Sequence, residues 1–124
     1  MKIALIGGGM VGRSFGEALA ANGMNVAWIW DAKPTTELHA FAKSIGASVH
    51  EGAGPWLAEA DLVVSAVFGT VAYEVAELAM PHMHANALFV DMTTADPSDM
   101  EKASALSKKH HVNFVDVAIT GAVN

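Results

Sequence analysis

The stretch that decides the fold lies at the N-terminus and reads Lys2-Ile3-Ala4-Leu5-Ile6-Gly7-Gly8-Gly9-Met10-Val11-Gly12. Residues 2–7, which are uncharged after Lys2 and mostly apolar, predict a strand, and the helical spacing of apolar residues from Met10 onward predicts a helix. Between them lies the pattern G-x-G-x-x-G. In this context Gly7 makes the tight turn, Gly9 lets a phosphate approach the backbone closely, and Gly12 lets the helix pack against the strand.

The beginning of that helix is a predicted phosphate site. Free N–H groups of its first turn and the positive end of its dipole favour an anion. Together with the glycine pattern, they predict that a dinucleotide is bound by Gly7, Gly8, Gly9, Met10, Val11 and Gly12. The alternative is a glycine-rich turn in some other α/β domain.

Asp31 supports the dinucleotide interpretation. It ends the next predicted strand, residues 25–31, and follows Gly12 by 19 residues. A carboxylate at this place bonds both ribose hydroxyls and repels a 2′-phosphate, so we predict NAD as the cofactor, with NADP less favoured. Lys33 nearby could soften that preference, and the alternative role for Asp31 is to cap the following loop.

Outward from this turn, short apolar segments alternate with amphipathic ones, which is typical of an α/β fold with parallel strands. Further strands are predicted at 25–31, 47–50, 62–68, 87–91 and 113–117, with helices at 10–23, 34–46, 70–80 and 96–110 and a loop with one short helix at 51–59. The continuous apolar run 62–68 predicts a central strand. Period-two alternation places Val26, Trp28 and Trp30 on one face of their strand, with the tryptophans packed under a helix. The sequence therefore predicts one domain, 1–124, with a doubly wound, mainly parallel six-stranded Rossmann sheet and helices on both faces.

Composition excludes several classes of function. The chain has 7 Lys and Arg against 13 Asp and Glu, for a formal net charge of −6, so nucleic acid is not an expected partner. It has no Cys, and therefore no disulfide. No apolar run reaches the ~18–20 residues that span a bilayer, so we expect no membrane partner and a cytoplasmic location. The histidines 82, 84, 110 and 111 lack a carboxylate at convincing spacing, so no metal is predicted.

Three later stretches can be read with the glycine turn: residues 61–68, Asp91-Met92-Thr93-Thr94-Ala95-Asp96-Pro97 and Asp116-Val117-Ala118-Ile119-Thr120-Gly121-Ala122. In this combination, over essentially all 124 residues, the sequence resembles the cofactor-binding half of the β-hydroxyacid dehydrogenase family, relatives of 3-hydroxyisobutyrate dehydrogenase, tartronate semialdehyde reductase and 6-phosphogluconate dehydrogenase. The glycine turn resembles the family's G-x-G-x-M-G. The last two stretches resemble its D-x-S-T-x-x-P and D-A-P-V-S-G-G motifs.

The resemblance implies cofactor contacts at Val67, Phe68 and Thr94, and substrate contacts at Thr120, Gly121 and Ala122. Val67 and Phe68 stand where the family has a Leu-Pro pair beside the cofactor. Thr120 keeps the hydroxyl of the S-G-G segment that holds the substrate carboxylate. Thr93 joins the substrate candidates because it follows a strand end, where open α/β sheets bind ligands. The alternative for the threonines is local capping of their loops.

The resemblance also implies hydride transfer between a nicotinamide cofactor and a small or phosphorylated 3-hydroxy acid or its semialdehyde. In the family, a Lys beyond the matched region accepts the hydroxyl proton. We assign no catalytic residue and expect the isolated chain to be inactive, with a helical catalytic domain absent from it. The expected partners are the substrate and either that helical domain or further copies of the chain. A non-catalytic dinucleotide-binding or sensing module is the alternative, and an imine-reducing relative is a third possibility, against which the segment 116–122 counts.

Overall fold

Six strands form one sheet in the order β3-β2-β1-β4-β5-β6. They are β1 (Lys2–Ile6), β2 (Asn25–Trp30), β3 (Ser48–His50), β4 (Leu62–Ser65), β5 (Leu88–Asp91) and β6 (Asn113–Asp116). This computed structural model describes residues 1–7, 9–93 and 96–117, and every neighbouring pair of these strands is parallel. The predicted doubly wound sheet is confirmed, with wholly parallel pairing. Strand order reverses between β1 and β4, which is the switch point where such sheets bind ligands.

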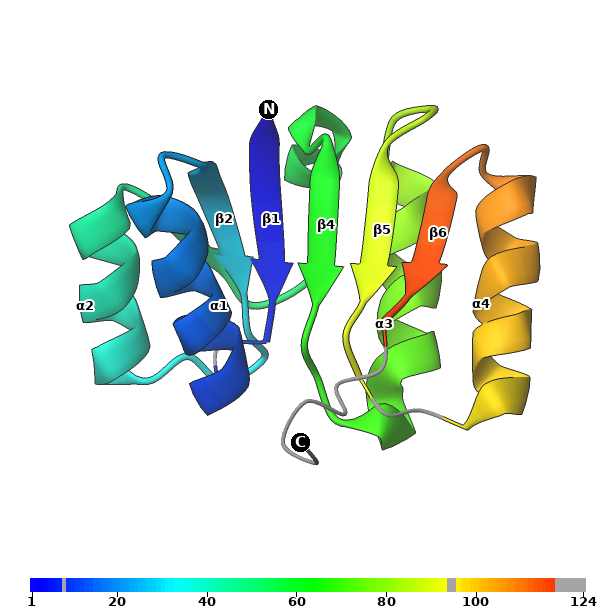
Figure 1. Cartoon of the computed structure of the whole chain (residues 1–124), viewed down its shortest axis with the longest axis horizontal. Coiled ribbons are helices and arrows are strands. Elements are labelled where there is room, and N and C mark those ends of the chain that lie inside the picture. Colours follow the sequence, from blue (N-terminus) through cyan, green and yellow to red (C-terminus); the bar gives the residue numbers. More distant parts are fainter. Residues whose placement is uncertain (8, 94–95, 118–124) are drawn as a thin grey trace.

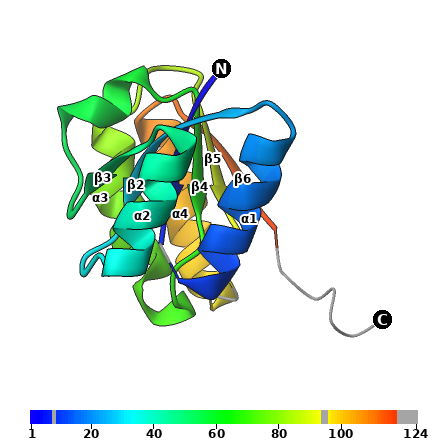
Figure 2. The same ribbon diagram turned by 90° about the vertical axis from the view of Figure 1, so that its left-hand side faces the viewer.

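In the described part of the chain, four α-helices cover the two faces of the sheet. They are α1 (Met10–Ala21), α2 (Thr36–Ile45), α3 (Ala72–Ala79) and α4 (Pro97–Lys109), with 3₁₀ segments η1 (Pro55–Glu59), η2 (Gly69–Val71) and η3 (Met80–His82). Right-handed crossovers that run outward from the centre in opposite directions place their helices on opposite faces. Accordingly, α1 and α2 lie on one face, the front face, and α3 and α4 on the other, the back face (Figures 1 and 2).

Each face carries its own apolar core. The front core joins β1, β2 and β4 to α1 and α2, and its buried members are Ile3, Leu5, Val26, Ile29, Leu38, Phe41, Ala42 and Val64. The back core joins the sheet to η1, α3 and α4, and its largest fully buried side chains include Ile6, Leu57, Val63, Met80 and Phe89. Burial on both faces explains why the central strands read as continuous apolar runs.

Val26 lies on the front face, whereas Trp28 and Trp30 lie on the back face, so the prediction that all three share a face is wrong. The register between β1 and β2 shifts by one residue, which leaves Ala27 as an extra residue in β2. An extra residue shifts the period-two alternation by one position, so residues before the bulge face the opposite side of the sheet from the side that strict alternation predicts. Both tryptophans pack on Trp56 of η1, with ring centroids 5.9 and 6.4 Å apart.

The predicted strand 62–68 is also too long, because β4 ends at Ser65. Its partner β1 stops at the same level, and Gly7 then takes a φ of +96° and leads the chain out of the sheet. With no neighbouring backbone left to pair with, Val67 and Phe68 belong to the loop before η2. This shortening places both residues at the carboxyl edge of the sheet.

Helix boundaries follow local capping. The Thr35 hydroxyl accepts the N–H of Leu38 at 3.1 Å at the beginning of α2, and Gly46 ends that helix with a φ of 75°. Asp96 caps α4 by accepting the N–H of Ser98 at 3.0 Å. The helix predicted from residue 70 begins as η2 and becomes α-helical only at Ala72. No helix in the described ranges is long and apolar enough to cross a bilayer.

Candidate functional site

The three described glycines of the turn after β1 differ in their surroundings. A Cβ atom on Gly12 would lie 2.0 Å from the carbonyl oxygen of Gly7, and one on Gly7 would lie 2.5 Å from that of Ala66. Among the described residues, nothing lies within 4 Å of a Cβ placed on Gly9. The turn therefore needs glycine at 7 and 12 for its own packing, whereas Gly9 faces open space that a ligand can enter.

The N-terminus of α1, at Met10 and Val11, lacks the side-chain cap that two other helices have. Its N-cap is Gly9, with no side-chain hydrogen bond and no acidic residue in the first turn, whereas Thr35 and Asp96 cap α2 and α4. The first N–H groups of a helix need acceptors, and the helix dipole favours an anionic one. This end of α1, beside the open space at Gly9, fits a phosphate group.

Asp31 directly follows β2 and is held by two backbone contacts. Its N–H donates to the His50 carbonyl at 2.9 Å, and its Oδ1 accepts the N–H of Lys33 at 2.8 Å. Next to it, the N–H of Gly7 donates to the Trp30 carbonyl at 2.8 Å, which ties the glycine turn to the end of β2. The structure thus brings the predicted phosphate and ribose contacts to the same edge of the sheet.

On the other side of the switch point, Phe68 is the most exposed large apolar side chain of the described chain, at 85%. It shares a surface hollow of about 600 Å³ with η2 and the first turn of α4, lined by Phe68, Gly69, Thr70, Asp96 and Asp99. This size lies within the range of small-molecule sites. Val67 is partly buried against the back core.

Thr93 follows β5 and is buried, with 6% of its surface exposed. Its N–H donates to Asp91 Oδ1 at 2.7 Å, and its hydroxyl donates to the same oxygen. Burial raises the pKa of the Asp91 carboxyl and nearby Asp116 adds to the rise, while the hydrogen bonds from Thr93 oppose it. In this structure Thr93 holds the loop after β5, as its capping alternative predicts, and its contact with substrate stays a prediction.

Several predicted site residues lie outside the described ranges: Gly8, Thr94, Thr120, Gly121 and Ala122. Their roles stay predictions. Within the described ranges, no three His, Asp or Glu side chains gather as metal ligands. His84 instead approaches Asp61, with Nε2 and Oδ1 3.1 Å apart.

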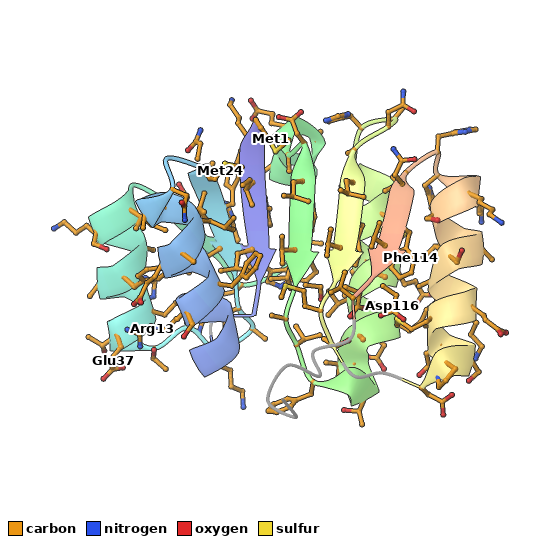
Figure 3. The ribbon with its side chains drawn as sticks, viewed as in Figure 1. Met1, Arg13, Met24, Glu37, Phe114 and Asp116 are labelled. Carbon is orange, nitrogen blue, oxygen red and sulfur yellow. The ribbon has the colours of Figure 1, made fainter. Side chains whose placement is uncertain are left out.

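Sequence reasoning missed two features of this edge. Arg13 lies between α1 and α2 (Figure 3), with its Cζ 5.8 Å from the Phe41 ring centroid. Asp96 and Asp99 of α4 share a hollow with Phe68 of the preceding crossover. No motif marks these residues, because the contacts between them depend on how two crossovers pack. The only signal in the sequence is that Arg13, Asp96 and Asp99 are charged residues in the first turns of the predicted helices 10–23 and 96–110.

Strand order 3-2-1-4-5-6, a glycine turn before an uncapped helix and an acid at the end of β2 define a dinucleotide-binding domain. The family model for the NAD binding domain of 6-phosphogluconate dehydrogenase matches residues 2–124. The chain belongs to this family, as the motifs predict. No curated protein sequence matches it.

Solved structures share the fold. A conserved hypothetical protein from Sinorhizobium meliloti 1021 matches with a TM-score of 0.84 and 26% identity, over 98% of this chain and 42% of that one. Mycobacterium tuberculosis 3-hydroxyisobutyrate dehydrogenase, solved with L-serine, gives 0.80 and 24%, over 97% and 40%. An imine reductase from Myxococcus stipitatus, in complex with NADP⁺, gives 0.78 and 17%, over 98% and 42%. The chain therefore spans 40 to 42% of the length of these proteins.

Proposed function

We propose that this chain is the cofactor-binding part of a dehydrogenase that transfers a hydride between NAD and a small or phosphorylated 3-hydroxy acid or its semialdehyde. The observation that carries the proposal is the turn after β1, where Gly12 packs against Gly7 and Gly9 leaves open space at an uncapped helix. Membership of a dehydrogenase cofactor-domain family favours this function over a sensing module.

The chain's own residues would bind and orient the cofactor, which supplies the hydride acceptor or donor when bound. The first turn of α1 would hold the pyrophosphate and Asp31 the adenosine ribose, so that the nicotinamide half lies over β4 and β5, beside Phe68. Of the lysines, Lys33 lies near this edge but on the adenosine side. We propose that the group accepting the substrate proton comes from outside these 124 residues.

The cofactor preference can be measured directly. We expect NADH to bind this chain roughly tenfold or more tightly than NADPH, because a 2′-phosphate would lose the hydrogen bonds to Asp31 and be repelled by it. Calorimetric titration with each dinucleotide tests this, and Asp31→Ser should remove most of the difference. Glu101→Gln, an exposed acid of α4, makes the same change in net charge elsewhere. Tighter binding of NADPH by the unmodified chain would exclude NAD as the preferred cofactor.

We propose that a helical catalytic part, or association with further copies, completes the enzyme. Two observations support a missing partner: the solved relatives are more than twice as long as this chain, and no helix of the described residues lies in front of β5 and β6 (Figure 1). Three valines lie in register across β4, β5 and β6: Val64, Val90 and Val115. The exposed fraction of the side chain is 2% at Val64 and 43% at Val115. Contact there would bury apolar surface and bring new groups to the carboxyl edge.

A further inference from the structure

Charge is distributed unevenly along the carboxyl edge. On the side of β1 and β2, the cationic Arg13 and Lys33 accompany the acidic Asp31, so both signs of charge are present. On the side of β4, β5 and β6, the described loop residues 66–71, 92–93, 96–99 and 117 include Asp96 and Asp99 but no Lys, Arg or His. The nicotinamide half of a bound dinucleotide would therefore meet carboxylates and no cation from these loops.

The negative charges of Asp96 and Asp99 lie at the hollow beside Phe68. Asp96 and Asp99 line it together with the exposed Phe68 ring. The Asp96 carboxylate is fixed by Ser98, whose N–H and hydroxyl donate to Oδ1 at 3.0 and 2.9 Å. Those hydrogen bonds lower the pKa of Asp96, and the charge of Lys102 on α4 lowers it further, so Asp96 is ionised at neutral pH. A hollow lined by an aromatic ring and two carboxylates suits a planar organic cation, since both kinds of group attract positive charge.

The nicotinamide ring is such a cation in only one of its redox states. It carries one positive charge when oxidised and none when reduced, while the pyrophosphate charge stays the same. We propose that the hollow between Phe68 and the first turn of α4 receives the oxidised nicotinamide ring and makes this site select NAD⁺ over NADH. This inference rests on the proposed function, and it assigns Asp96 and Asp99 as specificity residues for the redox state of the cofactor.

A preference for NAD⁺ over NADH that arises at the hollow must be distinguished from a preference that arises from the net negative charge of the whole chain. A net charge of −6 also disfavours NADH, which has one more negative charge than NAD⁺. Glu59 separates the two effects, because it is an exposed acid beside Lys2, at the amino edge of the sheet, with Nζ and Oε1 3.5 Å apart. Neutralising Glu59 changes the net charge as neutralising Asp96 or Asp99 does, but far from the hollow.

Calorimetric titration of the 124-residue chain with NAD⁺ and with NADH tests the proposal. We expect NAD⁺ to bind roughly fivefold more tightly at low salt, with the ratio falling toward one at about 0.5 M NaCl as screening increases. The double variant Asp96→Asn, Asp99→Asn should lose most of the preference and bind NADH at least as tightly as the unmodified chain. Asn is a good N-cap, so α4 should persist, which circular dichroism checks. Glu59→Gln should leave the ratio close to that of the unmodified chain.

The remaining outcomes are distinct. Equal affinities for NAD⁺ and NADH at low salt would overturn the selection and leave the proposed function standing. An unchanged ratio in the double variant, or an equal loss in Glu59→Gln, would assign the preference to net charge and overturn the role of the hollow. Binding of neither dinucleotide would overturn the proposed function, and this inference with it.

Discussion

At the scale of single residues, the glycines after β1 have two different roles: some are needed for packing of the turn, and one leaves space for a ligand. Gly12 has no room for a Cβ atom because the carbonyl oxygen of Gly7 lies where that atom would be. Gly9 has an ordinary extended backbone, with φ of −70° and ψ of −175°, and open space around it. The same residue type therefore serves the fold at one position and the ligand at another.

Replacing each glycine by alanine tests that division. Gly12→Ala should destabilise the chain by about 3 kcal/mol or more, because the helix must move away from the turn to accommodate the methyl group. Gly9→Ala should change the free energy of unfolding by less than about 0.5 kcal/mol while weakening NADH binding, since the methyl group occupies the open space. Urea unfolding and calorimetry measure the two effects. A Gly12→Ala protein as stable as the unmodified chain would contradict the packing role.

The sequence predicts site residues well where backbone chemistry decides and poorly where side-chain packing does. The roles of Gly7 and Gly12 in packing follow from the motif, and the place of Asp31 follows from its position at the end of the second strand, 19 residues after Gly12. Thr93 could not be assigned between its two roles, because the partner of a hydroxyl depends on the local loop. The hollow that joins Phe68 to Asp96 depends on two separate crossovers, and no local pattern records it.

At the scale of elements, His84 links three segments at the amino edge of the sheet. Its Nδ1 lies 2.9 Å from the Ala85 carbonyl and its Nε2 lies 3.1 Å from Asp61 Oδ1, while Asp61 Oδ2 accepts the N–H of Lys2 at 2.8 Å. Both ring nitrogens face acceptors, which only the protonated imidazolium can satisfy. The bond to Ala85 is the largest cause that raises the pKa of His84; burial lowers this pKa, and the pairing with Asp61 raises it further.

This arrangement predicts pH-dependent stability. Because the pKa of His84 is raised in the folded chain, its contribution is complete below the unfolded value of about 6.5 and is lost as pH rises through the folded value. His84→Gln should therefore be less stable than the unmodified chain near pH 5.5, and the difference in melting temperature should shrink by about pH 8.5. His39→Gln removes another exposed histidine as a control. A difference that is constant across this range would exclude the charged pair.

Most elements are predictable because hydrophobic period and capping residues agree along the chain. The errors occur where pairing with a neighbouring strand determines the face of a residue or the end of a strand. The bulge at Ala27 moves Val26 to the other face, and β4 ends at Ser65 because β1 leaves the sheet there. Neither depends on a propensity within the strand concerned, so a single sequence does not record them.

At the scale of the whole molecule, topology determines what stays uncovered. Right-handed crossovers place α1 and α2 in front of β1 to β3 and place α3 and α4 behind β4 to β6. No connection between these six strands can cover the front of β5 and β6. The β5 residues Leu88 and Val90 are only partly buried there, and Val115 and Val117 are 43% and 42% exposed.

This open apolar surface predicts association of the isolated chain. We expect sedimentation to show species larger than 12.9 kDa at high concentration, together with binding of an apolar dye. Val115→Lys with Val117→Lys should reduce both, with little change in stability, because these side chains make few contacts in the monomer. Leu78→Lys, at a 55% exposed site on α3, tests whether any surface lysine has this effect. A wild-type chain that stays monomeric and binds no dye would show that this surface needs no partner, and would remove the support it gives to a missing catalytic part.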